Sequence, residues 1–451
     1  MHGPARALAR LVRAVSRRLG RSGGTTAPGR MLLALSPRAL GRMGAELDEG
    51  SVLISATNGK TTTAAMVAAT LERAGRPVVH NRAGSNMAWG VATALLDAGR
   101  SPGQIGLFEV DEAWLPQVAG ELRPRLLLLA NLFRDQLDRY GELESLADRW
   151  AELVSGPGAP PELVLNADDP LVADLGRERD GVTYFGLEDD SQALPELQHA
   201  ADSKHCRNCG AAYNYEAVYL GHMGRYRCPS CGRERPRPDV AATRVRLQGM
   251  SGSDIDIRTP QGELSVRLPA PGLYNVYNAI AATATALRLG VAPEAVREAL
   301  EGFGGAFGRV ETIPVGEHEL SILLIKNPAG ANEVLRTITL EDGALDLWVA
   351  LNDRIADGRD VSWIWDADFE LLRGRVRRVT CSGTRAEEMA VRLKYAALGA
   401  QIEVDRDLEA SLDGALAATP GRRLFALPTY TALLDLRDLL SRRGLAARWS
   451  A

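Results

Sequence analysis

The sequence predicts an α/β protein in which a parallel sheet is buried on both faces and is followed by a second α/β domain. Short apolar runs alternate with helical stretches from Val52 onward, and a loop of phosphate-binding character follows the first run. Four cysteines in two close pairs interrupt this pattern near the middle of the chain. Nearly continuous apolar strands between helices are typical of parallel sheets. A chain of 451 residues is long enough for two to three domains.

The composition is that of a globular protein, with 45% hydrophobic and 24% charged residues. The net charge of −4 argues against general nucleic-acid binding, which depends on an excess of basic residues. No apolar run reaches the roughly 18 residues that indicate a transmembrane helix.

Residues 1–48 are predicted to form a helical lead-in. The first half is basic and rich in Ala and Leu, without the long apolar core or the cleavage site of a secretory signal. Such a segment suits an amphipathic helix that packs on the protein itself, or one that contacts an anionic membrane. The expected location is the cytoplasm, with the inner face of the plasma membrane as the more specific alternative.

Residues 49–312 are predicted to form a central domain. Polar residues follow its apolar runs at their carboxyl ends, where open α/β sheets bind ligands. Alternating residues predict later strands at 243–247 and 262–268, before helices near Asn275 and over 292–302. The earlier strands are expected at 52–54, 76–80, 105–110, 125–131 and 162–166.

The loop over residues 55–63 reads Ser-Ala-Thr-Asn-Gly-Lys-Thr-Thr-Thr. A Gly-Lys-Thr at a helix start presents backbone N–H groups, the helix dipole and an ammonium group to phosphates, and the Thr hydroxyl can bind Mg²⁺. Only four lysines occur among the 53 basic residues, so Lys60 indicates a position that needs a compact charge. The predicted nucleotide-binding residues of the loop are Thr57, Asn58, Gly59, Lys60, Thr61 and Thr62.

The cysteines form two Cys-x2-Cys pairs that 18 residues separate, which is the spacing of tetrahedral zinc sites. The four predicted ligands are Cys206, Cys209, Cys228 and Cys231. Two disulfides are the alternative, which the lack of an export signal disfavours. Because four thiolates fill the coordination shell, we expect a structural zinc in a small β-ribbon over residues 202–235. Cys381 is expected to be a small core residue.

The phosphate-binding loop departs from the general pattern, because Ile54 stands where that pattern has glycine, five residues before Gly59. The loop resembles instead the Gly-Thr-Asn-Gly-Lys-Thr loop of the Mur ligase superfamily, with Ala56 at the first glycine. Gln136 and Tyr274 replace histidines of that family. The other segments that resemble its motifs, in the same order, are 108–112, 131–140, 165–170, 271–279 and 308–311.

This resemblance implies a Mur ligase-type central domain that binds ATP. It implies that Glu109 holds Mg²⁺ together with Thr61, since carboxylate and hydroxyl oxygens suit this cation. Lys60 and Glu109 are therefore also candidate catalytic residues, because phosphoryl transfer needs charge neutralisation. The nucleotide-binding candidates that the resemblance adds are Asn275, Asn278 and Arg309.

Residues 313–451 are predicted to form a second, Rossmann-like α/β domain, with strands at 320–325, 345–351, 376–381 and 423–427. Its segments 325–332 and 351–366, together with the zinc insertion, resemble the MurT family, the synthetase subunits of lipid II isoglutaminyl synthase. Two absences agree with this resemblance. The stretch before the loop is shorter than the nucleotide-sugar domain of the amino-acid-adding ligases, and no lysine matches the one that is carbamylated in several of them.

The resemblance implies ATP-dependent amidation of the D-glutamate α-carboxylate in the lipid II stem peptide, through an acyl phosphate that ammonia attacks. No Cys–His pair of glutaminase type is evident, so ammonia is expected from a separate GatD-like glutamine amidotransferase subunit in a heterodimer. The family implies that Asp360 completes the triad of this partner by orienting its imidazole. Alternatively, Asp360 caps a helix before Val361, and the neighbouring Trp363 and Trp365 suit an interface or a core.

Two other functions stay open at this point. An amino-acid-adding Mur or folylpolyglutamate-type ligase would share the fold and use a different nucleophile. The short N-terminal stretch, the substituted histidines and the zinc insertion weigh against it. A nucleic-acid-binding protein would use the zinc ribbon, and the acidic net charge weighs against this alternative.

Overall fold

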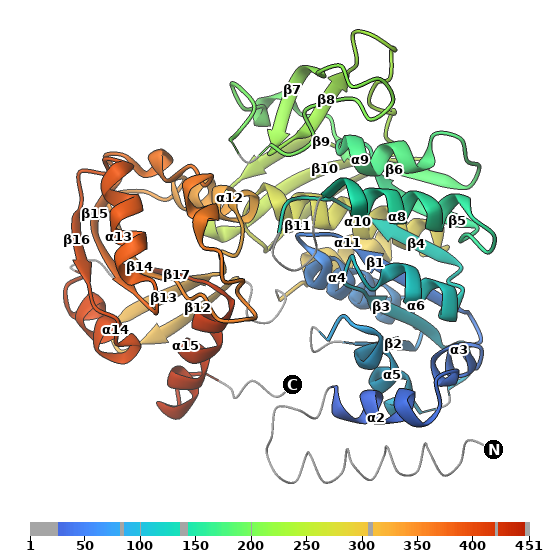
Figure 1. Cartoon of the computed structure of the whole chain (residues 1–451), viewed down its shortest axis with the longest axis horizontal. Coiled ribbons are helices and arrows are strands. Elements are labelled where there is room, and N and C mark those ends of the chain that lie inside the picture. Colours follow the sequence, from blue (N-terminus) through green and yellow to red (C-terminus); the bar gives the residue numbers. More distant parts are fainter. Residues whose placement is uncertain are drawn as a thin grey trace.

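The computed structural model describes residues 26–81, 85–99, 101–135, 143–199, 201–304, 310–419 and 423–446. These residues form two large sheets and one hairpin, and Figure 1 shows the two sheets in separate halves of the molecule. The expectations for the basic N-terminal helix, for Gln136 and for Arg309 concern residues outside the described part.

The central half is built on a nine-stranded sheet. Its strands are β1 (Ser51–Ser55), β2 (Val78–His80), β3 (Ile105–Glu109), β4 (Leu126–Leu129), β5 (Glu162–Asn166), β6 (Val182–Leu187), β9 (Val240–Leu247), β10 (Ser253–Thr259) and β11 (Gly262–Leu268). They lie in the order β11-β10-β9-β6-β5-β4-β1-β3-β2. All neighbours from β2 to β9 in this order pair in parallel, while β10 and β11 form an antiparallel edge. The predicted α/β fold class is confirmed.

Helices cover both faces of this sheet, because successive residues of its inner strands point to opposite layers. On β1, Val52 and Ile54 pack with one group of helices and Leu53 with the other. The first group is α4 (Lys60–Arg73), α10 (Leu273–Arg288) and α11 (Pro293–Glu301). The second is α2 (Ala27–Leu35), α3 (Ala39–Gly44), α5 (Ala88–Asp97), α6 (Leu115–Leu122) and α8 (Leu143–Ser155).

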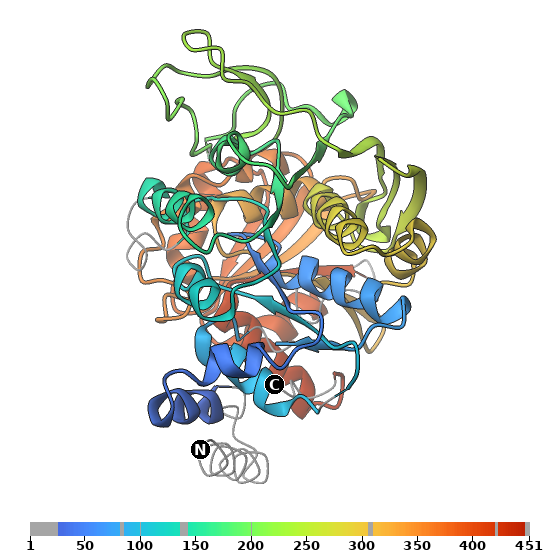
Figure 2. The same ribbon diagram turned by 90° about the vertical axis from the view of Figure 1, so that its right-hand side faces the viewer.

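A hairpin of β7 (Asn214–Leu220) and β8 (Met223–Arg227) lies between β6 and β9 in the chain. The two cysteine pairs flank it, as a small β-ribbon requires. The chain reaches it through α9 (Pro170–Ala173), η2 (Asp174–Gly176), β6 and η3 (Asp190–Gln192). In Figure 1 the hairpin stands above β9 and β10, and Figure 2 shows the same green segment projecting from one end of the molecule.

The C-terminal half has a six-stranded sheet in the order β12-β13-β17-β14-β15-β16, with only β12 antiparallel to its neighbour. The strands are β12 (Val310–Val315), β13 (His318–Leu323), β14 (Leu345–Ala350), β15 (Val376–Ser382), β16 (Gln401–Val404) and β17 (Arg423–Pro428). Its helices are α12 (Pro328–Ile338), α13 (Ala386–Tyr395), α14 (Leu408–Ala417) and α15 (Tyr430–Arg442). Its short 3-10 turns are η5 (Ser362–Trp365) and η6 (Phe369–Leu372), whereas η4 (Gly249–Ser251) lies between β9 and β10 of the central half.

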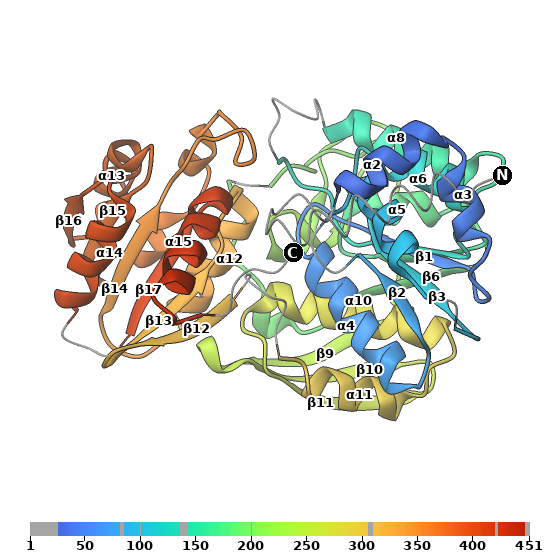
Figure 3. The same ribbon diagram turned by 90° about the horizontal axis from the view of Figure 1, so that it is seen from below.

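The two halves lie side by side (Figures 1 and 3), and α12 is the helix of the C-terminal half that contacts α10 and η4 of the central half. α12 and α13 cover one face of the second sheet, while α14 and α15 cover the other. Within the described part of the chain, no helix combines the length and the apolar character that crossing a bilayer requires.

Candidate active site

The predicted phosphate-binding loop connects β1 to α4 at the carboxyl edge of the central sheet. Gly59 has a φ of 89°, a left-handed conformation that side chains other than glycine rarely adopt. A Cβ at this position would lie 2.1 Å from Oδ1 of Asn278, so glycine is required for a second reason. Ala56, which stands where the family pattern has glycine, is buried and is not among the described non-glycine residues with positive φ. The alanine therefore causes no left-handed strain.

The loop after β4 fixes this phosphate-binding loop. The backbone N–H of Asn58 donates to Oδ1 of Asn131 at 2.9 Å, and Nδ2 of Asn131 donates to the carbonyl of Asn58 at 3.0 Å. The N–H of Phe133 donates to Oγ1 of Thr57 at 3.0 Å. These hydrogen bonds restrict the conformation of the whole loop. A loop that is fixed in this way is preorganised to bind phosphate.

Lys60 is buried beside Glu112. Its Nζ donates to Oε2 of Glu112 at 2.7 Å and also contacts the carbonyl oxygen of Ala56. Burial alone would lower the pKa of Lys60, but the carboxylates of Glu112 and Asp111 outweigh burial and raise it. Burial likewise opposes ionisation of Glu112, yet the charges of Lys60 and Lys326 lower the pKa of this carboxyl. Both groups are therefore charged near neutral pH.

Glu112 is a site residue that the sequence did not single out. It lies in the acidic segment 108–112, in which only Glu109 was selected as a candidate. Lys326, which lies between β13 and α12, is a second site residue that the sequence did not single out. Its Nζ donates to Oδ2 of Asp135 at 2.5 Å and lies 3.4 Å from the carbonyl oxygen of Thr57. The C-terminal half thus brings a second ammonium group to the loop.

Glu109 ends β3, and it is paired in register with Ile54 of β1, one residue before the end of that strand. It is 1% exposed, and Asn81 fixes its backbone N–H and carbonyl at 3.0 and 2.9 Å. Thr61 lies in the first turn of α4 and lines the same cavity as Asn58 and Gly59. Glu109 is not among the residues that line this cavity. Both residues lie near the carboxyl edge of the sheet, and their hard oxygens are of the kind that Mg²⁺ prefers.

Asn278 brings α10 to the loop. Its Oδ1 accepts a hydrogen bond from Oγ1 of Thr63 at 3.1 Å, and its Nδ2 donates to Oδ1 of Asn275 at 3.0 Å. Asn275 in turn donates to the carbonyl of Pro271 at 2.7 Å. Asn278 lines the cavity and Asn275 does not, so Asn275 acts on the cavity only by orienting Asn278. Thr62 lines the cavity, whereas Thr57 and Lys60 lie beside it.

The four predicted zinc ligands lie together, with all of their sulfur atoms within 4.8 Å of one another. The closest pairs are Cys206 with Cys231 at 3.5 Å and Cys209 with Cys228 at 3.4 Å. These distances exceed the length of about 2.05 Å that a disulfide has, so the thiols are free. Four free thiols converging from two Cys-x2-Cys turns fit a tetrahedral metal such as Zn²⁺.

Asp360 lies elsewhere, on the exposed loop between β14 and η5, and it does not line the cavity. Its Oδ1 accepts a hydrogen bond from the backbone N–H of Ser362 at 2.8 Å, and the hydrogen bonds from Ser362 lower the pKa of this carboxyl. This contact is a local turn in which a side chain accepts from the backbone two residues on. It is not the helix cap that the sequence offered as the alternative, because the cap position of η5 is Val361, which makes no side-chain cap hydrogen bond. Trp363 packs against the core of this half, whereas Trp365 is half exposed.

Comparison with known proteins defines the family. The model of the Mur ligase middle domain matches residues 54–228, and the model described as MurT ligase C-terminal matches residues 324–433. The MurT subunit of lipid II isoglutaminyl synthase (glutamine-hydrolyzing) from Staphylococcus aureus strain N315 is 33% identical over 440 residues, which are 96% of this chain and 97% of that protein. The chain belongs to the MurT family. The same subunit from Streptococcus pneumoniae strain ATCC BAA-255 / R6 is 32% identical over 436 residues, covering 96% and 95% of the two chains.

Solved structures agree on the fold. A pseudomurein peptide ligase type C from Methanothermus fervidus has a TM-score of 0.68 at 23% identity, over 88% of this chain and 79% of that one. MurF ligase from Thermotoga maritima, solved in complex with ADP, has a TM-score of 0.64 at 12% identity, over 91% and 85%. The predicted Mur ligase-type fold and the predicted resemblance to MurT are therefore confirmed. The MurT relatives are named as subunits, which implies that a chain of this family acts with a partner subunit.

Replacement of Cys206 by serine is expected to reduce bound zinc and to lower the melting temperature by several degrees. A structural zinc contributes folding free energy, and three thiolates hold it more weakly than four. Zinc content by mass spectrometry and a thermal melt measure both effects. Cys381→Ala is the control, because that buried thiol lies in β15, away from the cluster. Unchanged zinc content and melting temperature in Cys206→Ser would show that the cluster is not a metal site.

Glu112→Gln is expected to destabilise the nucleotide-free protein at neutral pH by about 1–3 kcal/mol, because a charged acceptor of Lys60 becomes neutral. The pKa of Glu112 is lowered, so its stabilisation is complete above its ordinary value of 4.5 and is lost as the pH falls through the folded-state pKa. The difference between the two proteins in urea denaturation should therefore shrink in acid. If the difference in unfolding free energy between the two proteins stays constant with pH, the ion pair is contradicted. Glu152→Gln is the control, because Glu152 is exposed.

Proposed function

We propose that this chain is the synthetase subunit of a lipid II isoglutaminyl synthase. It amidates the α-carboxylate of D-glutamate in the lipid II stem peptide at the expense of ATP. The observation that supports this function best is the similarity to named MurT subunits over 96% of the chain, which includes both halves that line the cavity. Because lipid II is membrane-bound, the proposed location is the cytoplasm, at the inner face of the plasma membrane.

The reaction has two steps. An oxygen of the carboxylate attacks the γ-phosphorus of ATP, ADP leaves, and an acyl phosphate forms. Ammonia then attacks the acyl carbon, phosphate leaves, and the amide remains after loss of a proton. Both steps depend on neutralising phosphate charge and on positioning, which are the main contributions of proteins to phosphoryl transfer.

The residues of the loop have separate tasks in this proposal. The N–H groups of Gly59 to Thr62 and the ammonium group of Lys60 bind the phosphates, and Lys326 approaches them from the C-terminal half. Phosphate binding requires Lys60 to exchange its contact with Glu112 for the nucleotide. Glu109 and Thr61 would hold Mg²⁺, whose charge would neutralise part of the phosphate charge. Asn278, oriented by Asn275, contacts the nucleoside side of the cavity, and Arg309 remains a predicted nucleotide-binding residue.

Ammonia comes from a GatD-like glutaminase subunit in this proposal. Asp360 is exposed on its loop, as a residue that acts on a partner must be. Its role is to accept a hydrogen bond from the imidazole of the partner and to stabilise the positive charge that forms there. The lowered pKa of Asp360 keeps its carboxylate charged for this purpose. The four cysteines hold a structural Zn²⁺.

Lys60→Ala is expected to reduce ATP-dependent amidation by about 10²–10³-fold, the usual effect of removing one preorganised charge-stabilising donor. The melting temperature should also fall, because Glu112 loses its buried partner, so activity is measured at a temperature where the variant is folded. Amide formation is measured by mass spectrometry of the lipid product. Lys394→Ala, which removes an exposed lysine from α13, should retain full activity. An active Lys60→Ala protein would refute the phosphate-binding assignment.

Asp360→Asn is expected to reduce glutamine-dependent amidation by up to about 10⁴-fold, because the partner imidazole loses its charged acceptor. Activity with added ammonium chloride should be retained, since ATP activation of the carboxylate does not involve this residue. The two activities are compared in the purified two-subunit complex, with Asp366→Asn as a control at the end of the same loop region. Equal loss with both nitrogen donors would contradict the role across the interface.

A further inference from the structure

The hairpin β7–β8 reaches the cavity that contains the phosphate-binding loop. Leu220 ends β7 and Met223 begins β8, and the two residues pair with each other across the turn. Both side chains line the cavity, together with Phe133 and Tyr274. The loop over residues 58–62 thus gives the cavity a polar lining, and the hairpin gives it an apolar lining.

The turn of the hairpin is fitted against the loop after β4. Gly221 has a φ of 59°, and a Cβ at this position would lie 2.6 Å from Cε1 of Phe133. The next residue, His222, is fully buried, and its ring centroid lies 4.6 Å from that of Phe133. Its Nε2 is 3.3 Å from Oδ2 of Asp169, which also accepts from the N–H of Leu132 at 2.8 Å. The hairpin and the phosphate-binding loop are therefore held by the same segment, 131–133.

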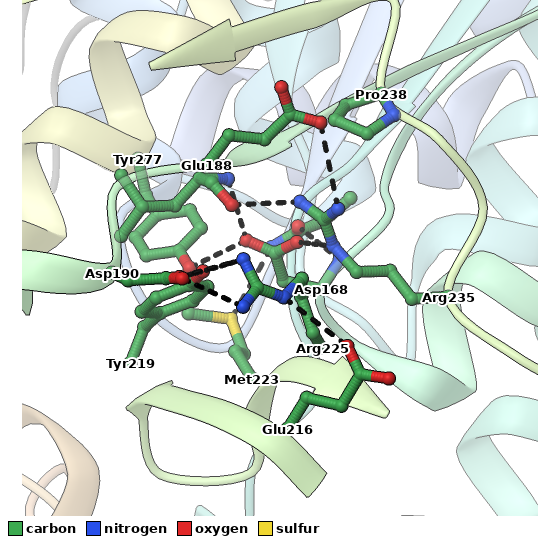
Figure 4. Close-up of polar contacts among 12 residues, drawn as sticks. Asp168, Glu188, Asp190, Glu216, Tyr219, Met223, Arg225, Arg235, Pro238 and Tyr277 are labelled. Carbon is green, nitrogen blue, oxygen red and sulfur yellow. Dashed lines mark hydrogen bonds and ion pairs between the residues drawn. The ribbon is translucent and has the colours of Figure 1, made fainter. Parts of the chain in front are cut away.

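A buried ion pair fixes the base of the hairpin (Figure 4). Asp168 follows β5, and its Oδ1 accepts from Nε of Arg235, four residues after the second cysteine pair, at 2.5 Å. Oδ2 of Asp168 accepts from the hydroxyl of Tyr277 on α10 at 2.7 Å. Its carbonyl oxygen accepts from the N–H of Gly224 in β8 at 2.9 Å. Asp168 thus links the end of β5 to α10, to β8 near the hairpin turn and to the segment after the second cysteine pair.

The hairpin also contacts the C-terminal half. Nη1 of Arg336 on α12 donates to the carbonyl oxygen of Tyr219 at 2.8 Å, and the same nitrogen donates to Glu333 at 2.8 Å. Glu333 lines the cavity with Ala329 of the same helix. The hairpin therefore lies at the point where the walls from the two halves of the molecule meet.

We propose that the ribbon hairpin is a wall of the nucleotide pocket that contacts the purine base of ATP through Leu220 and Met223. Asp168 and Arg235 are positioning residues that hold this wall. The inference rests on the ATP site proposed above. Phosphates occupy the polar end of the cavity, so the flat, largely apolar base lies against its apolar end. The flexible thioether of Met223 is suited to packing on an aromatic face.

The test compares two probes in the purified two-subunit complex. Calorimetry gives the dissociation constants of MgADP, which has a base, and of magnesium tripolyphosphate, which has none. Met223→Ala and Leu220→Ala should each raise the dissociation constant of MgADP by roughly tenfold, about 1.4 kcal/mol of lost contact, and leave that of tripolyphosphate unchanged. Glu216→Ala is the matched control, because its side chain on the same hairpin is 72% exposed.

Arg235 is tested by the dissociation constant of MgADP divided by that of magnesium tripolyphosphate, a ratio that a general loss of stability would not change. Arg235→Gln should raise this ratio. Arg235→Lys should bring the ratio most of the way back to that of the unmodified protein, since lysine keeps the charge beside Asp168. If Arg235→Gln does not fold, the Met223 and Leu220 variants still decide the proposal.

Two outcomes overturn the proposal. Unchanged MgADP binding in both Met223→Ala and Leu220→Ala excludes contact with the base. Equal weakening of MgADP and tripolyphosphate shows that the hairpin acts through the phosphate-binding loop and not on the base. Failure of the ATP site itself has a different signature, because Lys60→Ala would then leave the affinity for both probes unaltered.

Discussion

The active-site cavity depends on the way in which Asn58 is held from two directions. Asn131 of the central half pairs with its backbone N–H and carbonyl, while Asn327 of the C-terminal half donates from Nδ2 to its side-chain oxygen at 3.0 Å. Asn327 also caps α12 by accepting from the N–H of Gly330. The position of α12, and with it one wall of the cavity, is therefore coupled to the conformation of the phosphate-binding loop. A change in either half that displaces Asn58 alters both.

Each of the two ammonium groups beside this loop has a carboxylate partner in the structure. Lys60 faces Glu112, and Lys326 faces Asp135. Buried ammonium groups are costly unless they are paired, so the carboxylates keep both lysines charged and directed at the loop. In the proposed reaction phosphates replace the carboxylates as partners of the two lysines, because both groups carry negative charge. The contribution of the two lysines to the binding free energy is then the difference between the energies of the lysine–phosphate and lysine–carboxylate pairs. This difference is smaller than the energy of either set of pairs alone.

The sequence predicts those parts of the fold that local pattern determines. β1, β3, β4 and β5 were predicted because strands buried on both faces must be apolar at every position. β6, β10, β12 and β16 were not predicted; β12 and β16 are edge strands with few fully buried residues, so their sequences carry little apolar signal. The cysteine spacing predicted the cluster because the ligands are close in sequence.

The site residues divide in the same way. Gly59, Lys60 and Thr61 are defined by a contiguous motif, and the structure brings them together with Asn278 from 215 residues away through the hydrogen bond to Thr63. The pairing of Lys60 with Glu112 spans 52 residues, and that of Lys326 with Asp135 spans 191. No local pattern marks such partners, because their proximity is set by strand order. A charged residue at the end of a predicted strand is the only signal that could have indicated them.

The location of the cysteine-rich ribbon (residues 202–235) follows from strand register. β6 and β9 are parallel neighbours. The connection between two parallel strands normally carries the chain from the carboxyl end of the first strand back to the amino end of the second. Here Val240, the first residue of β9, pairs with Phe185, two residues before the end of β6. The chain between them therefore leaves and returns near the carboxyl edge, where the phosphate-binding loop also lies. The hairpin that is inserted at this point reaches the cavity through Leu220 and Met223, and the four cysteines flank it. The topology of the sheet thus allows the ribbon to lie beside the cavity.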